Sequence, residues 1–255
     1  MRRRALLALP VAAIACALRP AEARDRLAVA AAADLRFVLA DLLAAHPNLR
    51  VDVSFGASGS LVAQITQGAP FDVFLSADES LTRDLVARGL ADDRARFRYA
   101  RGHLALWASR ALAVDVPALG MRALLHPAIR RVAIANPRHA PYGRAALSAL
   151  SAAHLDAALA PKLIFGENVA QAMQMVQSGA ADAALVSLSL TFAPGVASTG
   201  QRFVVPGALH PPIEQGGIIL RRARDPVAAA AFVDVLRSPA ARAIFARHGF
   251  DPPAP

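Results

Sequence analysis

The hydrophobic pattern of the chain predicts strands and helices in regular alternation. Apolar residues at every second position predict a strand over residues 51–55, because this spacing places their side chains on one face. Apolar residues three and four positions apart predict a helix over residues 35–45. The same criteria predict further strands at 27–31, 71–75, 103–108, 131–135, 162–165 and 183–186, and further helices at 61–67, 79–90, 116–129, 142–153, 169–177, 226–236 and 239–248. This alternation is typical of α/β proteins, whose parallel strands bind ligands at their carboxyl ends.

Four junctions between a predicted strand and the next helix share one local design. At Asp34, Ser58, Tyr142 and Val169 the chain leaves a strand through small or capping residues and enters a helix. The first N–H groups of a helix lack partners within the helix and lie at the positive end of its dipole. If the four junctions face one cleft, their N–H groups can surround a tetrahedral oxyanion. The pattern alone does not show that they converge.

Each of these residues has a simpler explanation when it is taken singly. Ser58 or Ser60 is better explained as the N-cap of its helix, Tyr142 as an aromatic residue at a hinge, and Val169 as an ordinary first-turn residue. A hydrolase nucleophile at Ser58 is a further alternative. The segment does not have the Gly-x-Ser-x-Gly spacing of a nucleophile elbow, because Ser60 stands where the second glycine is required.

The first 23 residues have the pattern of a secretory signal peptide. Three arginines precede an apolar run, and Ala21-Glu22-Ala23 forms a cleavage site. We therefore expect a periplasmic protein. Cys16, the only cysteine, lies within this segment, so a lipoprotein anchored at Cys16 is a minor alternative. Cleavage after Ala23 would leave a mature chain without thiols, and hence without disulfides or thiolate metal sites.

Composition and charge narrow the function classes. Hydrophobic residues make up 55% of the chain and aromatic residues 5%, so alanine and leucine must fill most of the core. The formal charge of +9 suggests an acidic partner at first sight. The basic residues are scattered arginines without interleaved aromatic residues, which indicates a solvated basic surface and no nucleic-acid groove.

Five segments, in order along the chain, resemble one known family. They are VAAAADL at 29–35, GASGSLVAQITQGAPFDVFLSADE at 56–79, IANPRHAPYGRAAL at 134–147, FGENVAQAMQMVQSGAADAALVSLSL at 165–190 and LHPPIEQGGIIL at 209–220. Together they resemble the molybdate-binding proteins that serve ABC importers, which have the type II periplasmic binding protein fold. The resemblance runs from about residue 27 to about residue 250.

The resemblance implies an α/β fold of two lobes, each a mostly parallel sheet flanked by helices, with the ligand cleft between the lobes. The first lobe would comprise residues 24–105 together with 215–255, and the second residues 106–214. Two lobes joined by crossing segments can close over a ligand by a hinge motion.

The resemblance also implies roles for three of the junction residues. Ser58 would donate its hydroxyl and its backbone N–H to the anion. Tyr142 and Val169 would donate backbone N–H groups, so their side chains need not contact the anion.

Two further positions depart from the family pattern. Asp34 stands where members often carry serine or asparagine, and a carboxylate beside a dianion would repel it. We therefore predict that the Asp34 side chain turns away and caps its own helix, while its amide and that of Ala33 face the anion. Ser187 stands where some members carry an anion-binding tyrosine, so its shorter hydroxyl either reaches the anion or leaves that place to water.

The function implied by the resemblance is capture of molybdate, and also tungstate, for delivery to the membrane permease of an ABC importer. We expect a monomer that carries out no catalysis and needs no cofactor, with molybdenum present solely as the molybdate oxyanion. One alternative is a binder of another tetrahedral oxyanion, such as sulfate or phosphate. The other is a serine hydrolase using Ser58, for which no Ser-His-Asp arrangement can be identified from the spacing.

Overall fold

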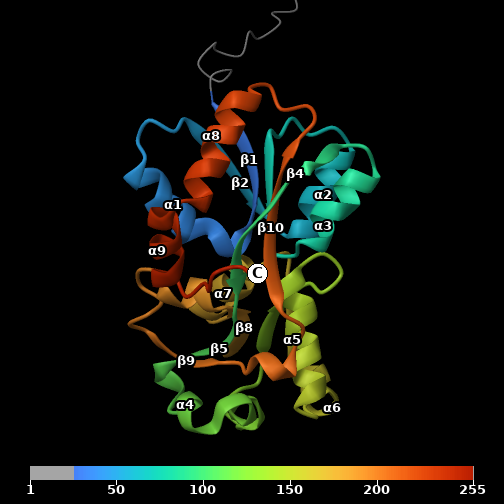
Figure 1. The fold of residues 1–255 in the computed structure, drawn as a ribbon. Helices are drawn as coiled ribbons and strands as arrows, with labels where there is room; N and C mark the ends of the chain where they lie inside the picture. The colour runs from blue at the N-terminus through green and yellow to red at the C-terminus, as the bar shows by residue number, and fades with distance from the viewer. Residues whose placement is uncertain (1–25, 255) are drawn as a thin grey trace, which may run out of the picture.

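The structure of the chain is a computed structural model, which describes residues 26–254. It consists of two lobes, one above the other in Figure 1, each built around a five-stranded sheet. Within the described residues, no helix combines the length and the apolar character needed to cross a membrane. The expected signal peptide at 1–23, including Cys16, lies outside the described residues.

The two sheets have the same strand arrangement. The first has the order β2-β1-β3-β10-β4 and the second β7-β6-β8-β5-β9. The strands of the first sheet are β1 (Leu27–Ala32), β2 (Val51–Gly56), β3 (Val73–Ser76), β4 (Ala91–Gly102) and β10 (Ile213–Leu220). Those of the second are β5 (Leu104–Ser109), β6 (Val132–Ala135), β7 (Leu163–Gly166), β8 (Ala183–Ser187) and β9 (Gly200–Val204). All seven predicted strands are confirmed, whereas β4, β9 and β10 were not predicted.

Strand direction follows from the way the chain enters each lobe. In each sheet as described, one strand runs against the others: β10 in the first and β5 in the second. These are the strands by which the chain enters a lobe from the other lobe. A strand that enters from the cleft begins at the cleft edge, so it is antiparallel to strands that end there. The carboxyl ends of the parallel strands therefore face the cleft, and the predicted mostly parallel sheets are confirmed.

Helices cover both faces of the first sheet. Strand β1 is buried on both sides: Val29 and Ala31 contact one cluster of apolar residues, and Ala30 contacts another. The first cluster includes residues of α1 (Arg36–Ala45), α8 (Pro226–Arg237) and α9 (Pro239–Arg247), and the second includes residues of α2 (Ser58–Thr66) and α3 (Ser80–Ala87). The predicted return of the last two helices to the first lobe is confirmed (Figure 1).

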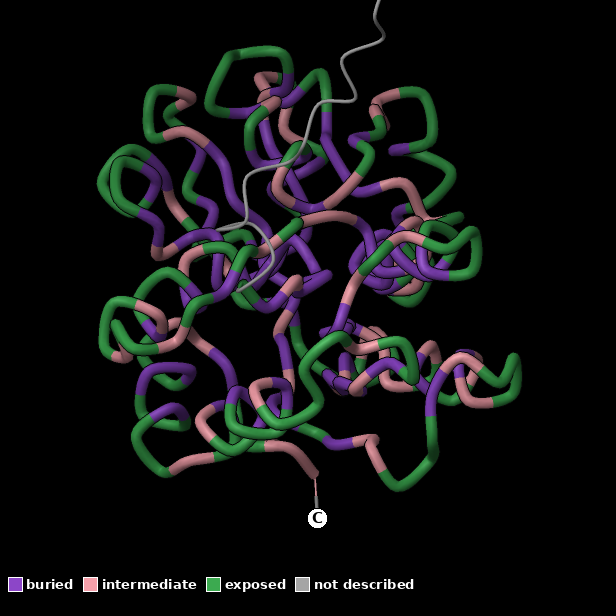
Figure 2. Tube along the Cα trace, turned by 90° about the horizontal axis from the view of Figure 1, so that it is seen from above, coloured by how far each residue is buried: buried purple, intermediate pink, exposed green. Residues whose placement is uncertain are grey.

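The second lobe has a core built largely from alanine and leucine, as the composition predicts. Its helices are α4 (Val116–Leu119), α5 (Pro141–Ala152), α6 (Asp156–Leu159) and α7 (Val169–Gln177). The buried residues lie along the middle of the molecule and the exposed residues at its rim (Figure 2). The predicted helix over 116–129 is wrong. Helix α4 ends after one turn, because Gly120 takes a positive φ of 56°, and a 3₁₀ segment follows.

Two segments connect the lobes. Strand β4 of the first sheet continues through His103 into β5 of the second, and the chain returns at the start of β10. Leu104 and Ala105, expected in the first lobe, therefore lie in the second sheet. Ile213 and Glu214, expected in the second lobe, lie in the first sheet. No turn residues mark the first crossing, because β4 and β5 are separated by His103 alone. The second crossing follows a connection between β9 and β10 that contains a 3₁₀ turn (Gly207–Leu209).

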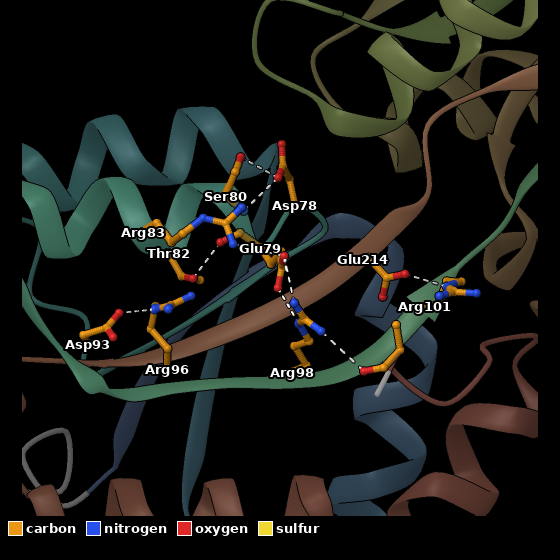
Figure 3. Close-up of polar contacts among 11 residues, drawn as sticks. Asp78, Glu79, Ser80, Thr82, Arg83, Asp93, Arg96, Arg98, Arg101 and Glu214 are labelled. Atoms are coloured by element: carbon orange, nitrogen blue, oxygen red, sulfur yellow. Dashed lines mark hydrogen bonds and ion pairs between the residues drawn. The ribbon is translucent and has the colours of Figure 1, made fainter.

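The edge strand β4 carries a row of paired arginines (Figure 3). Arg98 contacts Glu79, the N-cap residue of α3, at 2.5 Å, and Arg101 contacts Glu214 of β10 at 2.6 Å. Exposed ion pairs of this kind each contribute about 0–1 kcal/mol. Charged side chains on an edge strand also discourage pairing with other chains. The charges of β4 obscured the strand pattern in the sequence, which is why this strand was missed.

The contact between Trp107 and Gly200 gives a test of packing in the second lobe. A Cβ at Gly200 would lie 2.0 Å from two atoms of the Trp107 ring. We expect Gly200→Ala to lower the free energy of unfolding by about 1–3 kcal/mol, because the core has no room for a methyl group. Denaturant unfolding followed by the fluorescence of Trp107, the only tryptophan, measures this. Gly207→Ala is the control, since no atom lies within 4 Å of its Cβ position; equal losses in both variants would contradict the prediction.

Candidate anion-binding site

A cavity lies between the lobes where the carboxyl ends of the parallel strands face one another. Its free volume is small, about 10 Å³. It is lined by Ala32, Ala33, Asp34, Gly56, Ala57, Ser58, Ala77, Ala140, Pro141, Tyr142, Asn168 and Val169. The structure thus brings together the four predicted junctions, two from each lobe. Among the described residues lining the cavity there is no lysine or arginine.

Three helices begin at this cavity. Helices α2, α5 and α7 start at Ser58, Pro141 and Val169. The predicted N-cap of α7 is confirmed, because the Asn168 side chain accepts hydrogen bonds from two N–H groups of the first turn. Within residues 26–254, no hydrogen-bond partner is found for the backbone N–H groups of Ser58, Tyr142 and Val169. Three donors at the positive ends of helix dipoles are thus left for a ligand.

Ser58 occupies the first turn of α2 but does not cap it. The N-cap is Ala57, so the explanation of Ser58 or Ser60 as the N-cap is wrong. The Ser58 hydroxyl instead accepts a hydrogen bond of 3.1 Å from the N–H of Ala77, and the side chain is buried. Because the oxygen is used as an acceptor, the hydroxyl proton is left to be donated. In the described part of the chain, no histidine or carboxylate is hydrogen-bonded to Ser58.

Asp34 is placed differently from the prediction. It lies within a 3₁₀ turn (Ala33–Leu35), and α1 begins at Arg36, so the predicted helix capping by Asp34 is wrong. The inserted turn moves the helix start beyond the reach of the carboxyl group. Asp34 Oδ2 accepts a hydrogen bond of 2.5 Å from Nε2 of Gln215, a residue of β10. Asp34 Oδ1 is buried and has no hydrogen-bond partner among the described residues.

Burial controls the ionisation of the groups around Asp34. Loss of hydration raises the pKa of Asp34 to about 6, although hydrogen bonding with Gln215 and with the Tyr142 hydroxyl acts in the opposite direction. Burial also raises the pKa of the Tyr99 and Tyr142 hydroxyls well above 10, so both groups stay protonated. The cavity is therefore lined by neutral donors and by one carboxyl group whose charge depends on pH.

Ser187 lies behind the cavity and does not line it. Its hydroxyl lies 3.1 Å from the Tyr142 hydroxyl and 2.7 Å from the Ser189 hydroxyl, and its single proton can be donated to one of the two at a time. The Ser189 hydroxyl in turn donates to the backbone carbonyl of Asp34 at 2.8 Å, which links the two lobes. In this arrangement Ser187 orients Tyr142 and Ser189 from within the second lobe.

Gln215 and Tyr99 belong to the same network but were not predicted as site residues. Gln215 also donates to the Tyr142 hydroxyl at 3.3 Å, and Tyr99 donates to Gln215 at 2.8 Å. Gln215 is fully buried within the strand IEQGGIIL, where an amide side chain is unusual. That buried amide was the one sequence signal that could have identified it.

The lobes also contact each other at the rim of the cavity. The Gly59 N–H donates to the carbonyl of His139 at 2.9 Å, and Arg144 forms an ion pair of 2.6 Å with Asp78. His139 therefore contributes its backbone, while its side chain is exposed. These contacts hold the two halves of the cavity together.

Comparison with known proteins places the chain in a family. The model of the family described as bacterial extracellular solute-binding protein matches residues 27–251. The chain belongs to this family. A cavity lined by hydrogen-bond donors between two lobes fits a solute-binding protein.

Several proteins of known name or structure are similar to this solute-binding protein. The molybdate-binding protein ModA of Azotobacter vinelandii is 36% identical over 250 residues, which cover 97% of this chain and 96% of the relative. ModA of Rhodobacter capsulatus is 36% identical over 78% of this chain and 77% of its own. The solved structure of the Azotobacter vinelandii periplasmic molybdate-binding protein has a TM-score of 0.83 at 32% identity and covers 90% of this chain and all of its own. The sulfate-binding protein SubI of Mycobacterium tuberculosis, with a TM-score of 0.69 at 17% identity, shares the fold.

Asp34 predicts an unusual pH dependence for the stability of this solute-binding protein. Because the folded state raises the pKa from 3.8 to about 6, it binds the proton more tightly than the unfolded state does. The contribution of Asp34 to the free energy of unfolding is therefore complete below about pH 4 and is lost as the pH rises to about 6. The loss amounts to about 3 kcal/mol at pH 7.

We expect the free energy of unfolding of Asp34→Asn, relative to that of the wild type, to increase as the pH rises from about 4 to about 7.5. Asparagine keeps an acceptor for Gln215 and has no charge to bury. Denaturant unfolding of both proteins without ligand, at intervals between about pH 4 and 7.5, measures the difference. Asp234→Asn, at an exposed position of α8, is the control for loss of a surface carboxyl group. A constant difference between wild type and Asp34→Asn at every pH would contradict the assignment.

Proposed function

We propose that this protein captures molybdate, and also tungstate, in the cavity between its lobes and delivers it to the membrane permease of an ABC importer. The observation that carries this proposal is the convergence of helix N-termini from both lobes on one small cavity. The ModA relatives, which share about a third of their residues with this chain, indicate which oxyanion to test first.

The donors of the cavity suit a dianion. Ser58 offers a hydroxyl and an N–H group, Tyr142 and Val169 each offer an N–H group, and Ala33 lies beside them at the end of β1. A hydrogen bond to a charged group contributes on the order of 1.5–3 kcal/mol, so a set of them can offset the loss of hydration of a small anion. Ser187 lies behind these donors, and its hydroxyl contacts the Tyr142 hydroxyl and so orients that side chain.

Because the hydrogen-bond donors come from both lobes, binding of an anion favours closure of the cleft. An anion held by Ser58 of the first lobe and Val169 of the second bridges the cleft, so it favours the closed arrangement. We propose that the permease recognises this closed form. The chain would act in the periplasm as a monomer after removal of residues 1–23. The alternative is a lipoprotein anchored at Cys16.

Isothermal titration of the mature chain, residues 24–255, tests the proposed function. Molybdate, tungstate, sulfate and phosphate are added in separate experiments. We expect one-to-one binding of the first two and none of the others, because the size of the cavity must separate anions of equal charge and shape. Binding of sulfate or phosphate instead would replace the substrate, and no heat with any of the four would contradict the proposal.

Closure itself can be tested at Gly59. A Cβ at this position would lie 2.8 Å from the carbonyl oxygen of His139 in the other lobe, so Gly59→Ala should hold the lobes apart. We expect the affinity for molybdate to fall by about tenfold or more. The free energy of unfolding without ligand should stay equal or rise, because alanine favours a helix more than glycine does. Ser60→Ala, one position further along α2, is the control and should bind as the wild type does. Wild-type affinity in Gly59→Ala would show that closure does not depend on this contact.

A further inference from the structure

Asp34 is the exception in a cavity that otherwise offers neutral donors. An ionised carboxyl group beside a bound dianion is strongly unfavourable in a buried site, because neither charge is screened by water. The prediction that Asp34 avoids this repulsion by capping its helix is wrong. The structure must therefore accommodate the carboxyl group and the anion together in another way.

The two oxygens of the Asp34 carboxyl group differ in their surroundings. Oδ2 accepts the hydrogen bond from Gln215, whereas Oδ1 is buried and has no partner among residues 26–254. A buried polar atom without a hydrogen bond is unusual and costs stability. Asp34 is among the residues that line the anion cavity, so a ligand oxygen in that cavity is the partner that we assign to Oδ1.

The groups around Asp34 supply no positive charge. Gln215 of β10, Tyr142 of α5, Tyr99 of β4 and Ser189 contact the residue or act on its ionisation, and all four are neutral. The nearest arginine in the sequence, Arg36, lies over the ring of Phe55 at 5.0 Å. The crossing strands carry Arg101 and Glu214, which pair with each other. Within the described residues, no cation is paired with Asp34 to hold it ionised beside an anion.

We propose that Asp34 binds the anion as a neutral carboxylic acid, whose Oδ1 carries a proton and donates it in a hydrogen bond to an oxygen of the anion. This inference rests on the proposed function. Capture of one molybdate dianion then takes up one proton from solvent, and release of the anion returns it. No covalent bond of the anion forms or breaks. Asp34 thereby becomes a ligand-contacting residue that couples anion capture to pH.

The direction of the coupling follows from the charges. Burial has already raised the pKa of Asp34 to about 6 without ligand, and an adjacent dianion raises it further. Above about pH 6 the free protein is ionised at Asp34 and the complex is not, so binding must take up a proton. The dissociation constant should be constant below about pH 6 and rise up to about tenfold per pH unit above it.

The same geometry gives Asp34 a role in selectivity. A fully deprotonated anion such as molybdate needs a proton on Asp34. Hydrogen phosphate carries its own proton and could donate it to an ionised Asp34, so its binding would require no uptake. The penalty of proton uptake at Asp34 therefore falls on molybdate and not on hydrogen phosphate, so the exclusion expected for phosphate must come from the size of the cavity.

Isothermal titration of residues 24–255 with molybdate, between about pH 6.5 and 8.5, measures the proton uptake directly. Each titration is run in two buffers that differ in ionisation enthalpy, and the difference in heat gives the number of protons taken up. We expect uptake to approach one proton per anion at about pH 8 in the wild type, together with the rise in dissociation constant. Asp34→Asn should take up no proton and bind with an affinity that does not change with pH, because its amide donates without a proton from solvent. Asp234→Asn should behave as the wild type does.

A second readout does not depend on any variant folding. The infrared spectrum of the wild-type complex should contain the C=O stretch of a protonated carboxyl group, which the ligand-free protein lacks at the same pH of about 8. One-to-one binding of molybdate with no proton uptake and no such band would overturn this inference and leave the proposed function standing. Equal uptake in Asp34→Asn and the wild type would also overturn it, since the proton would then go elsewhere. Absence of any heat with molybdate would overturn the proposed function and this inference together.

Discussion

The direction of the strands is the constraint on which the rest of the structure depends. Because β5 and β10 enter their lobes from the cleft, they run against the other strands, whose carboxyl ends consequently meet at the cleft from both sides. The ends of β2, β6 and β7 lead through a few residues into the helices α2, α5 and α7. The first turns of three helices then present N–H groups without internal partners to one cavity. An anion site results from the chain path, without any basic side chain in it.

A second consequence is that the hinge and the site share one hydrogen-bond network. Tyr99 and Gln215 lie on the two strands that cross between the lobes, and Gln215 contacts both Asp34 and Tyr142. A change in the relative position of the lobes must therefore change the contacts of these side chains. Conversely, a ligand that alters the state of Asp34 acts on the strands about which the lobes move.

Short sequence patterns predicted those features of the fold that depend on neighbouring residues. The N-cap Asn168 and most strand and helix segments follow from periodicity and capping, which need a few neighbouring residues. Strand β4 was missed because its charges conceal its periodicity, and the helix after residue 116 was overextended because Gly120 breaks it. The contact of Asp34 with Gln215 joins residues 181 positions apart, so no local pattern contains it. The convergence of the junctions was likewise a conclusion that only the fold could supply.

The error at Asp34 has a physical cause of general interest. From the sequence, the residue was treated as a fixed negative charge, and repulsion then required it to turn away from the anion. In the structure the surroundings of the carboxyl group determine whether it is charged. Burial favours the neutral form, and Gln215 donates a hydrogen bond to one of its oxygens. A buried carboxyl group without a cationic partner is better described by the two states it can adopt than by its charge in water. An acidic residue in an anion site therefore need not turn away from the anion, because a neutral carboxyl group is itself a hydrogen-bond donor.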